Sequence, residues 1–332
     1  MNVLIIGAGR MGIRHLQGLL TVKEVESVTL LDIKQEALDT AKEIVQNDER
    51  VTYCIFDHYK PADNDLCIIA STADNRKKLC ELAAKCNCQY MMIEKPLGQS
   101  LSEVEEMVEY LDGMPYKTVV NLNMRLNAAV IKLKNDLKST PQLQGEKNIT
   151  LNTGSLGIGC NGIHYLDFLF FILGADKAEI VHAEVDDTLI PSGRGANFGD
   201  FGGWAVIKYY KDGNISGKAL LSMSSNSTVF GGWEIVAQHG KISIDEIVQK
   251  RTNVFRKAES TMPVYRYAAD YLPPQEESFI SPFLGDLTAL WVSELLKGNN
   301  LLPEIKESMK AHKLMFDWLS HSKTHNSVYP IT

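Results

Sequence analysis

The segment Gly7-Ala8-Gly9-Arg10-Met11-Gly12 directly follows the apolar run Asn2–Ile6 and constrains the fold of this chain more than any other feature. In such a segment the first glycine permits a tight turn, and the second lets backbone N–H groups approach a phosphate. The third lets a helix pack closely on a strand. The motif is weak alone, but here a strand precedes it and a helical pattern over Arg10–Leu20 follows. The segment therefore predicts a dinucleotide-binding turn with pyrophosphate at the helix N-terminus.

Asp32 ends the second apolar run, Val28–Leu31, about 20 residues after the last glycine of the motif. A carboxylate there accepts both ribose hydroxyls and repels a 2′-phosphate, so the sequence favours NAD over NADP. Lys34 is close enough to soften that preference, which keeps NADP possible. The alternative is a flavin-binding or purely structural domain of the same fold.

The first third of the chain alternates short apolar runs with helical patterns, which is typical of a doubly wound parallel sheet, the Rossmann fold. Helices are expected over 10–20, 35–46, about 75–85 and 102–111. The expected strands are Asn2–Ile6, Val28–Leu31, Val51–Ile55, Leu66–Ala70, Tyr90–Ile93 and Thr118–Asn121.

After residue 122 the pattern changes to an α+β domain with a large, mostly antiparallel open sheet. A chain of 332 residues is long for one core, so two domains are expected, 1–122 for NAD(P) and 123–332 for substrate binding and oligomerisation. The expected strands are Ala178–Asp186, Gly203–Tyr210, Ile215–Ser222 and Gly232–Gln238, and the expected helices are Ala128–Leu137, Ile163–Leu173, Phe283–Lys297 and Glu304–Ser320.

Composition narrows the class of protein. The net charge of −7 argues against nucleic acid as a partner. No apolar run approaches the roughly 20 residues that cross a bilayer, and no signal peptide is expected before the glycine motif. The six cysteines lack the spacing of a zinc site, so we expect no metal and reduced thiols in a cytoplasmic protein.

Glu94-Lys95-Pro96 follows the fifth predicted strand. Ligands of doubly wound sheets bind at the carboxyl ends of the strands, which puts Lys95 at the expected cleft. An amine there can handle a proton or polarise a substrate oxygen. The alternative is a surface lysine at a strand end.

Together these features resemble the Gfo/Idh/MocA oxidoreductases. The resemblance rests on the glycine motif, Asp32, Glu94-Lys95-Pro96 and three further segments. These are Ser71-Thr72-Ala73-Asp74-Asn75, Asn123-Met124-Arg125 and Gly162-Ile163-His164-Tyr165-Leu166-Asp167. It spans the whole chain and includes C-terminal helices that pack on the cofactor domain.

The resemblance implies oxidation or reduction of a sugar, cyclitol or nucleotide sugar, in dimers or tetramers formed through the C-terminal sheet. Lys95 looks like the catalytic lysine of the family and His164 like its proton-transferring histidine, whereas Asp167 is expected to be structural. The cofactor contacts that the resemblance implies are Gly7, Gly9, Arg10, Met11, Gly12, Asp32, Ser71, Thr72, Asn75, Glu94 and Lys95.

The chain departs from the family pattern at two positions. Many members carry Asp four residues before the histidine, where this chain has Cys160, followed by Asn161. A thiol supplies neither the charge nor the acceptors of a carboxylate, so Asn161 or the substrate would make the missing contact, or the chemistry differs. The family's proline three residues after Arg125 is Ala128 here.

The substrate is less constrained than the cofactor. Candidate contacts are Asn123 and Arg125, together with Cys160 and Asn161, and Arg194 in the loop 191–198, whose guanidinium can grip a phosphate or carboxylate. A solvated hairpin loop is the alternative for Arg194. Two other functions remain open: a glycoside-cleaving enzyme that retains NAD and oxidises its sugar transiently, and a non-catalytic dinucleotide-binding sensor or scaffold.

Overall fold

The computed structural model describes residues 1–154, 157–261, 270–323 and 328–332. They form two compact units. The first unit contains residues 1–126, 282–312 and 328–332, and the second contains residues 127–281 and 313–327. The chain therefore leaves the first unit and returns to it twice.

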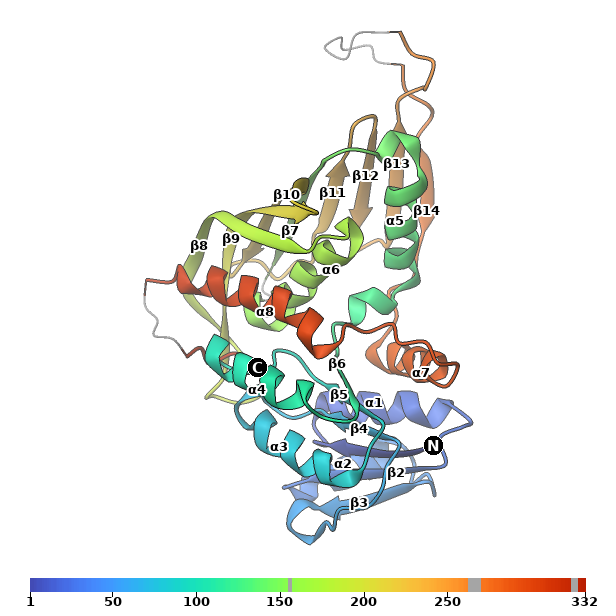
Figure 1. The fold of residues 1–332 in the computed structure, drawn as a ribbon, viewed down its shortest axis with the longest axis vertical. Helices are drawn as coiled ribbons and strands as arrows, with labels where there is room; N and C mark the ends of the chain where they lie inside the picture. Colours follow the sequence, from blue (N-terminus) through green and yellow to red (C-terminus); the bar gives the residue numbers. More distant parts are fainter. Residues whose placement is uncertain (155–156, 262–269, 324–327) are drawn as a thin grey trace. The chain divides into compact units, whose positions relative to one another are not determined.

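The first unit contains a six-stranded parallel sheet in the order β3-β2-β1-β4-β5-β6 (Figure 1). This order confirms the predicted doubly wound sheet, and it reverses between β1 and β4, which is where such sheets bind ligands. The strands are β1 (Asn2–Ile6), β2 (Ser27–Asp32), β3 (Val51–Ile55), β4 (Leu66–Ile69), β5 (Tyr90–Ile93) and β6 (Lys117–Val120).

The core of the first unit combines N-terminal and C-terminal segments. Apolar side chains at alternate strand positions, such as Val3, Ile5 and Ile68, share one buried cluster with Leu16 of α1 and Trp291 of α7. α7 thus belongs to this core although residues 127–281 of the second unit separate it from the strands in the sequence. The helices of the first unit are α1 (Arg10–Thr21), α2 (Gln35–Ile44), α3 (Arg76–Ala83), α4 (Leu101–Asp112) and α7 (Leu284–Leu295).

The second unit contains an eight-stranded sheet in the order β14-β13-β12-β11-β7-β10-β9-β8. β7 and β10 pair in parallel and the other neighbours pair antiparallel, which confirms the mostly antiparallel sheet. Figure 1 shows α5 (Ala128–Ser139) and α6 (Ile163–Leu173) beside it, and α8 (Ile305–Ser320) begins in the first unit and ends in the second. The strands are β7 (Lys147–Gly154), β8 (Lys177–Pro191), β9 (Gly199–Lys211), β10 (Asn214–Ser224), β11 (Gly232–Val236), β12 (Gly240–Asp245), β13 (Lys250–Phe255) and β14 (Gln275–Ser278).

Four strands of this sheet, β7, β12, β13 and β14, were not among the expected ones. β13 has no alternation of apolar residues that would predict a strand, because its buried residues, Arg251 and Asn253, are polar. The guanidinium of Arg251 lies 2.7 Å from Asp136 and 3.2 Å from Glu277, so its charge is balanced by acids distant in the sequence. In the part of the chain that the structure describes, no helix has the length and apolarity to cross a membrane.

Candidate functional site

The glycine turn between β1 and α1 has one crowded side and one open side. Gly7 has φ +109°, a conformation that favours glycine, and donates its N–H to the Leu31 carbonyl at 2.8 Å. A Cβ at Gly12 would overlap the Gly7 carbonyl oxygen, whereas a Cβ at Gly9 would meet no atom within 4 Å. Gly9 is the N-cap of α1. The turn therefore leaves the helix N-terminus open to an anion.

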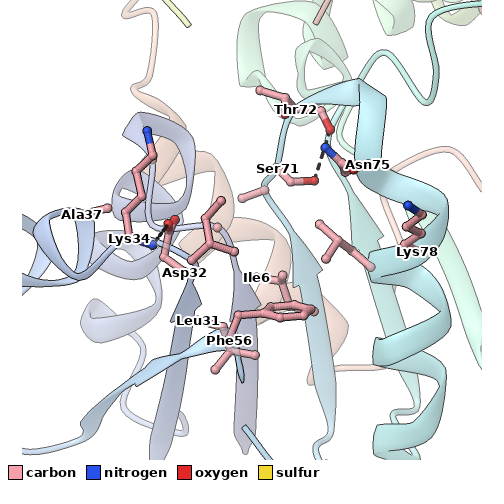
Figure 2. Close-up of a pocket in the computed structure, with 15 residues that line it drawn as sticks. Ile6, Leu31, Asp32, Lys34, Ala37, Phe56, Ser71, Thr72, Asn75 and Lys78 are labelled. Atoms are coloured by element: carbon pink, nitrogen blue, oxygen red, sulfur yellow. Dashed lines mark hydrogen bonds between the residues drawn. The ribbon is translucent and has the colours of Figure 1, made fainter. Parts of the chain in front are cut away.

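Asp32 ends β2 beside this turn, and two backbone N–H groups orient its carboxylate. Oδ2 accepts from Ala8 at 2.7 Å. Oδ1 accepts from Lys34 at 2.9 Å, a contact that Figure 2 shows. Because each carboxylate oxygen has two lone pairs, both retain the capacity to accept a ligand hydroxyl. The acid predicted for the ribose is thus held in a fixed orientation.

A cavity of about 620 Å³ lies at this edge of the sheet, within the usual range for small-molecule sites. Its lining includes six of the predicted cofactor residues, Gly7, Gly9, Asp32, Ser71, Thr72 and Asn75, and Figure 2 labels the last four. Motif reasoning did not identify the other lining residues, among them Ile33, Phe56, Lys78 and Leu79. Phe56 directly follows β3 at the ligand-binding edge, which is the signal that could have found it.

The donor set of this cavity fits the adenosine diphosphate part of NAD. Apolar side chains suit an adenine, the Asp32 carboxylate suits ribose hydroxyls, and the open N-terminus of α1 suits a pyrophosphate. The other predicted cofactor residues lie outside the lining. Arg10, Met11 and Gly12 form the first turn of α1, and Glu94 and Lys95 follow β5.

The turn 94–97 after β5 is buried, and the exposed fraction of Lys95 is only 6%. Its peptide bond to Pro96 is cis. Arg76 of α3 donates through Nη2 to the Ser71 carbonyl at 2.8 Å and to the Lys95 carbonyl at 3.4 Å. One buried guanidinium thus links the loop after β4 to the turn that carries Lys95.

Glu94 is held from two directions. Its Oε1 lies 2.9 Å from His15 Nε2 and accepts from Asn121 Nδ2 at 2.7 Å. Burial raises the pKa of Glu94. This effect is outweighed by the hydrogen bond and charge of His15, the charge of Lys95 and the hydrogen bond from Asn121, so the pKa lies well below its usual range. Glu94 is therefore ionised at neutral pH.

Asn123 and Arg125 lie in the short helix Asn123–Leu126 after β6. Arg125 is buried, and its Nη1 donates to Glu307 Oε1 of α8 at 2.7 Å. An acidic side chain thus already contacts this predicted substrate residue, and Asn123 is half-buried.

The other predicted catalytic and substrate residues lie in the second unit. Cys160 and Asn161 belong to the π-helix Gly157–Gly162, and His164 follows in the first turn of α6. All three side chains are half-buried. Residues 155 and 156, which precede this segment, lie outside the described residues.

Asp200, which the sequence analysis missed, organises this segment. It lies on β9, and its carboxylate accepts from the N–H of Gly159 at 3.0 Å and of Cys160 at 2.5 Å. The structure thus brings a buried carboxylate against the backbone of the position where the family pattern has Asp. Arg194 lies half-buried in the turn between β8 and β9, with its N–H on Ser192 Oγ at 3.1 Å.

Residues 1–121 match a family model, GFO_IDH_MocA, described as an oxidoreductase family with an NAD-binding Rossmann fold. Residues 1–121 are therefore similar to the cofactor domain of the Gfo/Idh/MocA oxidoreductases. The match confirms, for residues 1–121, the resemblance drawn from the motifs. No curated protein matches the chain.

Solved structures of several oxidoreductases and of a repressor protein share the fold of nearly the whole chain. A levoglucosan dehydrogenase in complex with NADH has TM-score 0.73 and 14% identity, covering 97% of this chain and 96% of that one. A putative myo-inositol dehydrogenase from Sinorhizobium meliloti 1021 has TM-score 0.69 and 16% identity, with 97% of each chain covered. The super-repressor mutant of Gal80p from Saccharomyces cerevisiae has TM-score 0.72 and 12% identity, covering 97% and 96%. At these identities the likeness establishes the fold.

Proposed function

We propose that this chain is an NAD-dependent dehydrogenase that moves a hydride between nicotinamide and a carbinol or carbonyl carbon of a sugar, cyclitol or nucleotide sugar. The cavity of the first unit carries the proposal, because its lining matches the parts of an adenosine diphosphate. The levoglucosan dehydrogenase and the putative myo-inositol dehydrogenase of the same fold support the substrate class.

NAD, when bound, supplies the hydride acceptor, and the residues of the first unit hold its adenosine half. The open turn at Gly9 and the N-terminus of α1 bind the pyrophosphate. Asp32 accepts the ribose hydroxyls, and its fixed negative charge disfavours a 2′-phosphate. NAD is therefore the preferred cofactor, although Lys34 and Lys78 line the same cavity and leave weaker binding of NADP possible.

Lys95 and His164 are the proposed catalytic residues. Lys95 hydrogen-bonds the reacting oxygen of the substrate and stabilises the charge that develops on it. His164 takes the hydroxyl proton in the oxidative direction, a role that suits an imidazole near neutral pH. Asn123, Arg125, Cys160, Asn161 and Arg194 are the proposed substrate contacts.

The test is the absorbance of reduced nicotinamide, followed with NAD or NADP and a panel of free and nucleotide-linked sugars and cyclitols. We expect one substrate class to support reduction, and Lys95→Ala and His164→Ala to abolish it. Lys77→Ala, an exposed lysine of the same unit that pairs with Glu106, is the matched control and should react like the wild type. Absence of reduction with every substrate would contradict the proposal.

Two observations favour a second function, a dinucleotide-binding sensor without catalysis. Cys160 replaces the usual Asp of the family pattern, and a super-repressor mutant of Gal80p shares the fold. Tight NADH binding without turnover of any sugar would support the sensor. Conversion of a glycoside without net nicotinamide reduction would instead support transient oxidation by retained NAD.

We also propose a homodimer or homotetramer formed through the eight-stranded sheet. Leu220 of β10 and Val236 of β11 are 42% and 40% exposed, and with Val206 of β9 they line one open hollow on the sheet. Exposed apolar side chains grouped on one face are typical of a protein–protein interface.

A further inference from the structure

Buried polar side chains from three helices gather around the turn 94–97. His15 comes from α1, Arg76 from α3 and His312 from α8, and Asn121 follows β6. Their exposed fractions are between 0% and 3%. A buried polar group is costly unless it is hydrogen-bonded, so such a concentration at one turn suggests a role in holding it.

His312 contacts the turn as a neutral imidazole. Its Nε2 accepts the N–H of Leu97 at 3.1 Å, so that nitrogen carries no proton. Its Nδ1 lies 2.9 Å from the Ser308 carbonyl, which can only accept, so Nδ1 carries the proton. Burial lowers the pKa of His312 to about 4, a direction that agrees with this neutral state.

His15 meets the same turn with a different set of partners. Its Nδ1 lies 2.8 Å from Thr288 Oγ1. The single hydroxyl proton of Thr288 is already donated to the Leu284 carbonyl at 2.9 Å. The hydroxyl can therefore only accept from His15, and Nδ1 must carry a proton.

The second nitrogen of His15 faces a carboxylate oxygen. Nε2 lies 2.9 Å from Glu94 Oε1, which also accepts from Asn121. Apart from His15, the charge of Lys95 and the hydrogen bond from Asn121 both favour the ionised form of Glu94, which is the usual form of a carboxyl group at pH 7. An ionised carboxylate has no proton to give, so Nε2 also donates.

We propose that His15 is a buried imidazolium held between Thr288 and Glu94, and that this pair positions the turn carrying Lys95 for hydride transfer. α1 begins at the glycine turn, where the dinucleotide is expected to bind. The His15–Glu94 pair therefore connects this helix to the turn 94–97, which carries Lys95. Hydrogen bonds between ionised groups are shorter and stronger than neutral ones. The positioning role rests on the proposed function, whereas the charge state of His15 does not.

The charge state is tested by nitrogen-15 NMR of histidine-labelled, full-length protein at pH 7, with and without NAD. We expect both ring nitrogens of His15 to show protonated shifts, and His312, the internal reference, to show one protonated and one unprotonated nitrogen. Signals are assigned from contacts to the Thr288 methyl group and from a His312→Gln variant. An unprotonated nitrogen on His15 would overturn the inference.

The positioning role is tested by Thr288→Val and Thr288→Ser. Valine keeps the shape but removes the acceptor of the Nδ1 proton, whereas serine restores the hydroxyl. We expect Thr288→Val to lower kcat about tenfold, the order expected for a lost charged hydrogen bond. The KM values for NAD and substrate should stay within about twofold of the wild type, and the NMR spectrum of His15 should change. Serine should recover most of kcat.

The outcomes separate this inference from the proposed function. Wild-type kcat in Thr288→Val would overturn the positioning role, even in an active enzyme. A wild-type protein that oxidises no sugar would defeat the proposed function, and the NMR measurement would still decide the charge state of His15.

Discussion

Gly9 and Gly12 lie in the same turn but have opposite surroundings. A Cβ at Gly9 meets open space, whereas a Cβ at Gly12 overlaps the Gly7 carbonyl. Gly9 also has extended backbone, with φ −70° and ψ −177°, which alanine tolerates. We therefore expect Gly9→Ala to keep the wild-type melting temperature. Its affinity for NADH should fall at least tenfold, because the added methyl group occupies the place proposed for the pyrophosphate.

Gly12→Ala is the matched comparison. Its methyl group forces α1 away from the turn, so we expect both the melting temperature and NADH affinity to fall. Differential scanning fluorimetry and titration of NADH fluorescence measure the two effects. Unchanged NADH affinity in Gly9→Ala would contradict the placement of the cofactor.

Asp32 sets the expected preference for NAD. Asp32→Ser removes the carboxylate, so we expect NADH affinity to fall roughly tenfold, as expected for lost charged hydrogen bonds, and NADPH affinity to rise. Titration of both reduced nucleotides measures the ratio, and Glu43→Gln, an exposed acid of α2, is the control. A ratio equal to that of the wild type would show that Asp32 does not select the cofactor.

Motifs located the residues that lie at fixed distances from a strand end, such as Gly7, Asp32 and Asn75. They did not locate Lys78 on α3, which reaches the cavity from a helix, or Asp200, whose role depends on a contact with the backbone of Cys160. Such contacts join segments distant in the sequence. No local pattern encodes them.

His312 of α8 accepts a hydrogen bond from the Leu97 N–H in the turn 94–97. Because His312 is buried as a neutral imidazole, the free energy of unfolding should depend on pH. Burial lowers the pKa of His312 from 6.5 to about 4, with the charge of Arg76 adding to the effect and a hydrogen bond to Ser308 opposing it. As the pH falls, the unfolded state binds the proton first. The contribution of His312 is therefore complete above pH 6.5 and is lost as the pH falls from 6.5 to about 4.

We expect this group alone to lower the free energy of unfolding of the first unit by on the order of 2–3 kcal/mol across that window. His312→Gln should flatten the pH dependence by that amount, and exposed His58→Gln should not. Urea unfolding at pH 7 and near pH 4 measures both. Equal pH dependence in His312→Gln and the wild type would contradict a neutral, buried His312.

Apolar alternation was not sufficient to find every strand, because β12 was missed although it buries Ile242 and Ile244 at alternate positions. Strands with polar buried residues have no such pattern to find. The parallel strands β1 and β4 are nearly continuous apolar runs because both faces of their sheet are covered. β13 buries Arg251 only because Asp136 of α5 and Glu277 of β14 balance its charge. The pattern of β13 is therefore readable only after α5 and β14 are in place.

Assembly through the eight-stranded sheet predicts a sensitive position at Leu220. We expect Leu220→Lys to convert the oligomer to a monomer, because a charge in a buried interface lacks a partner. Ile247→Lys, equally apolar but in the turn after β12, should leave the oligomer intact. Light scattering after size-exclusion chromatography measures the mass, and a monomeric wild type would contradict the proposed assembly.

The path of the whole chain was the least accessible feature from its sequence. The first unit is completed by residues 282–312 and 328–332, far from the strands that they contact. Thr332 Oγ1 accepts the N–H of Ala73 at 3.2 Å, and the Ile331 carbonyl accepts from Gln99 at 3.1 Å. The C-terminal residues thus support the loops after β4 and β5, where proposed cofactor residues lie.

Transfer of deuterium from substrate to nicotinamide tests the central claim most directly. Carbon-deuterated sugars and cyclitols are incubated with the wild-type protein and NAD, and the released nicotinamide is analysed by mass spectrometry. A dehydrogenase releases NADH that carries one deuterium for each sugar oxidised. Released nicotinamide without deuterium, beside unchanged or cleaved sugar, would contradict the account.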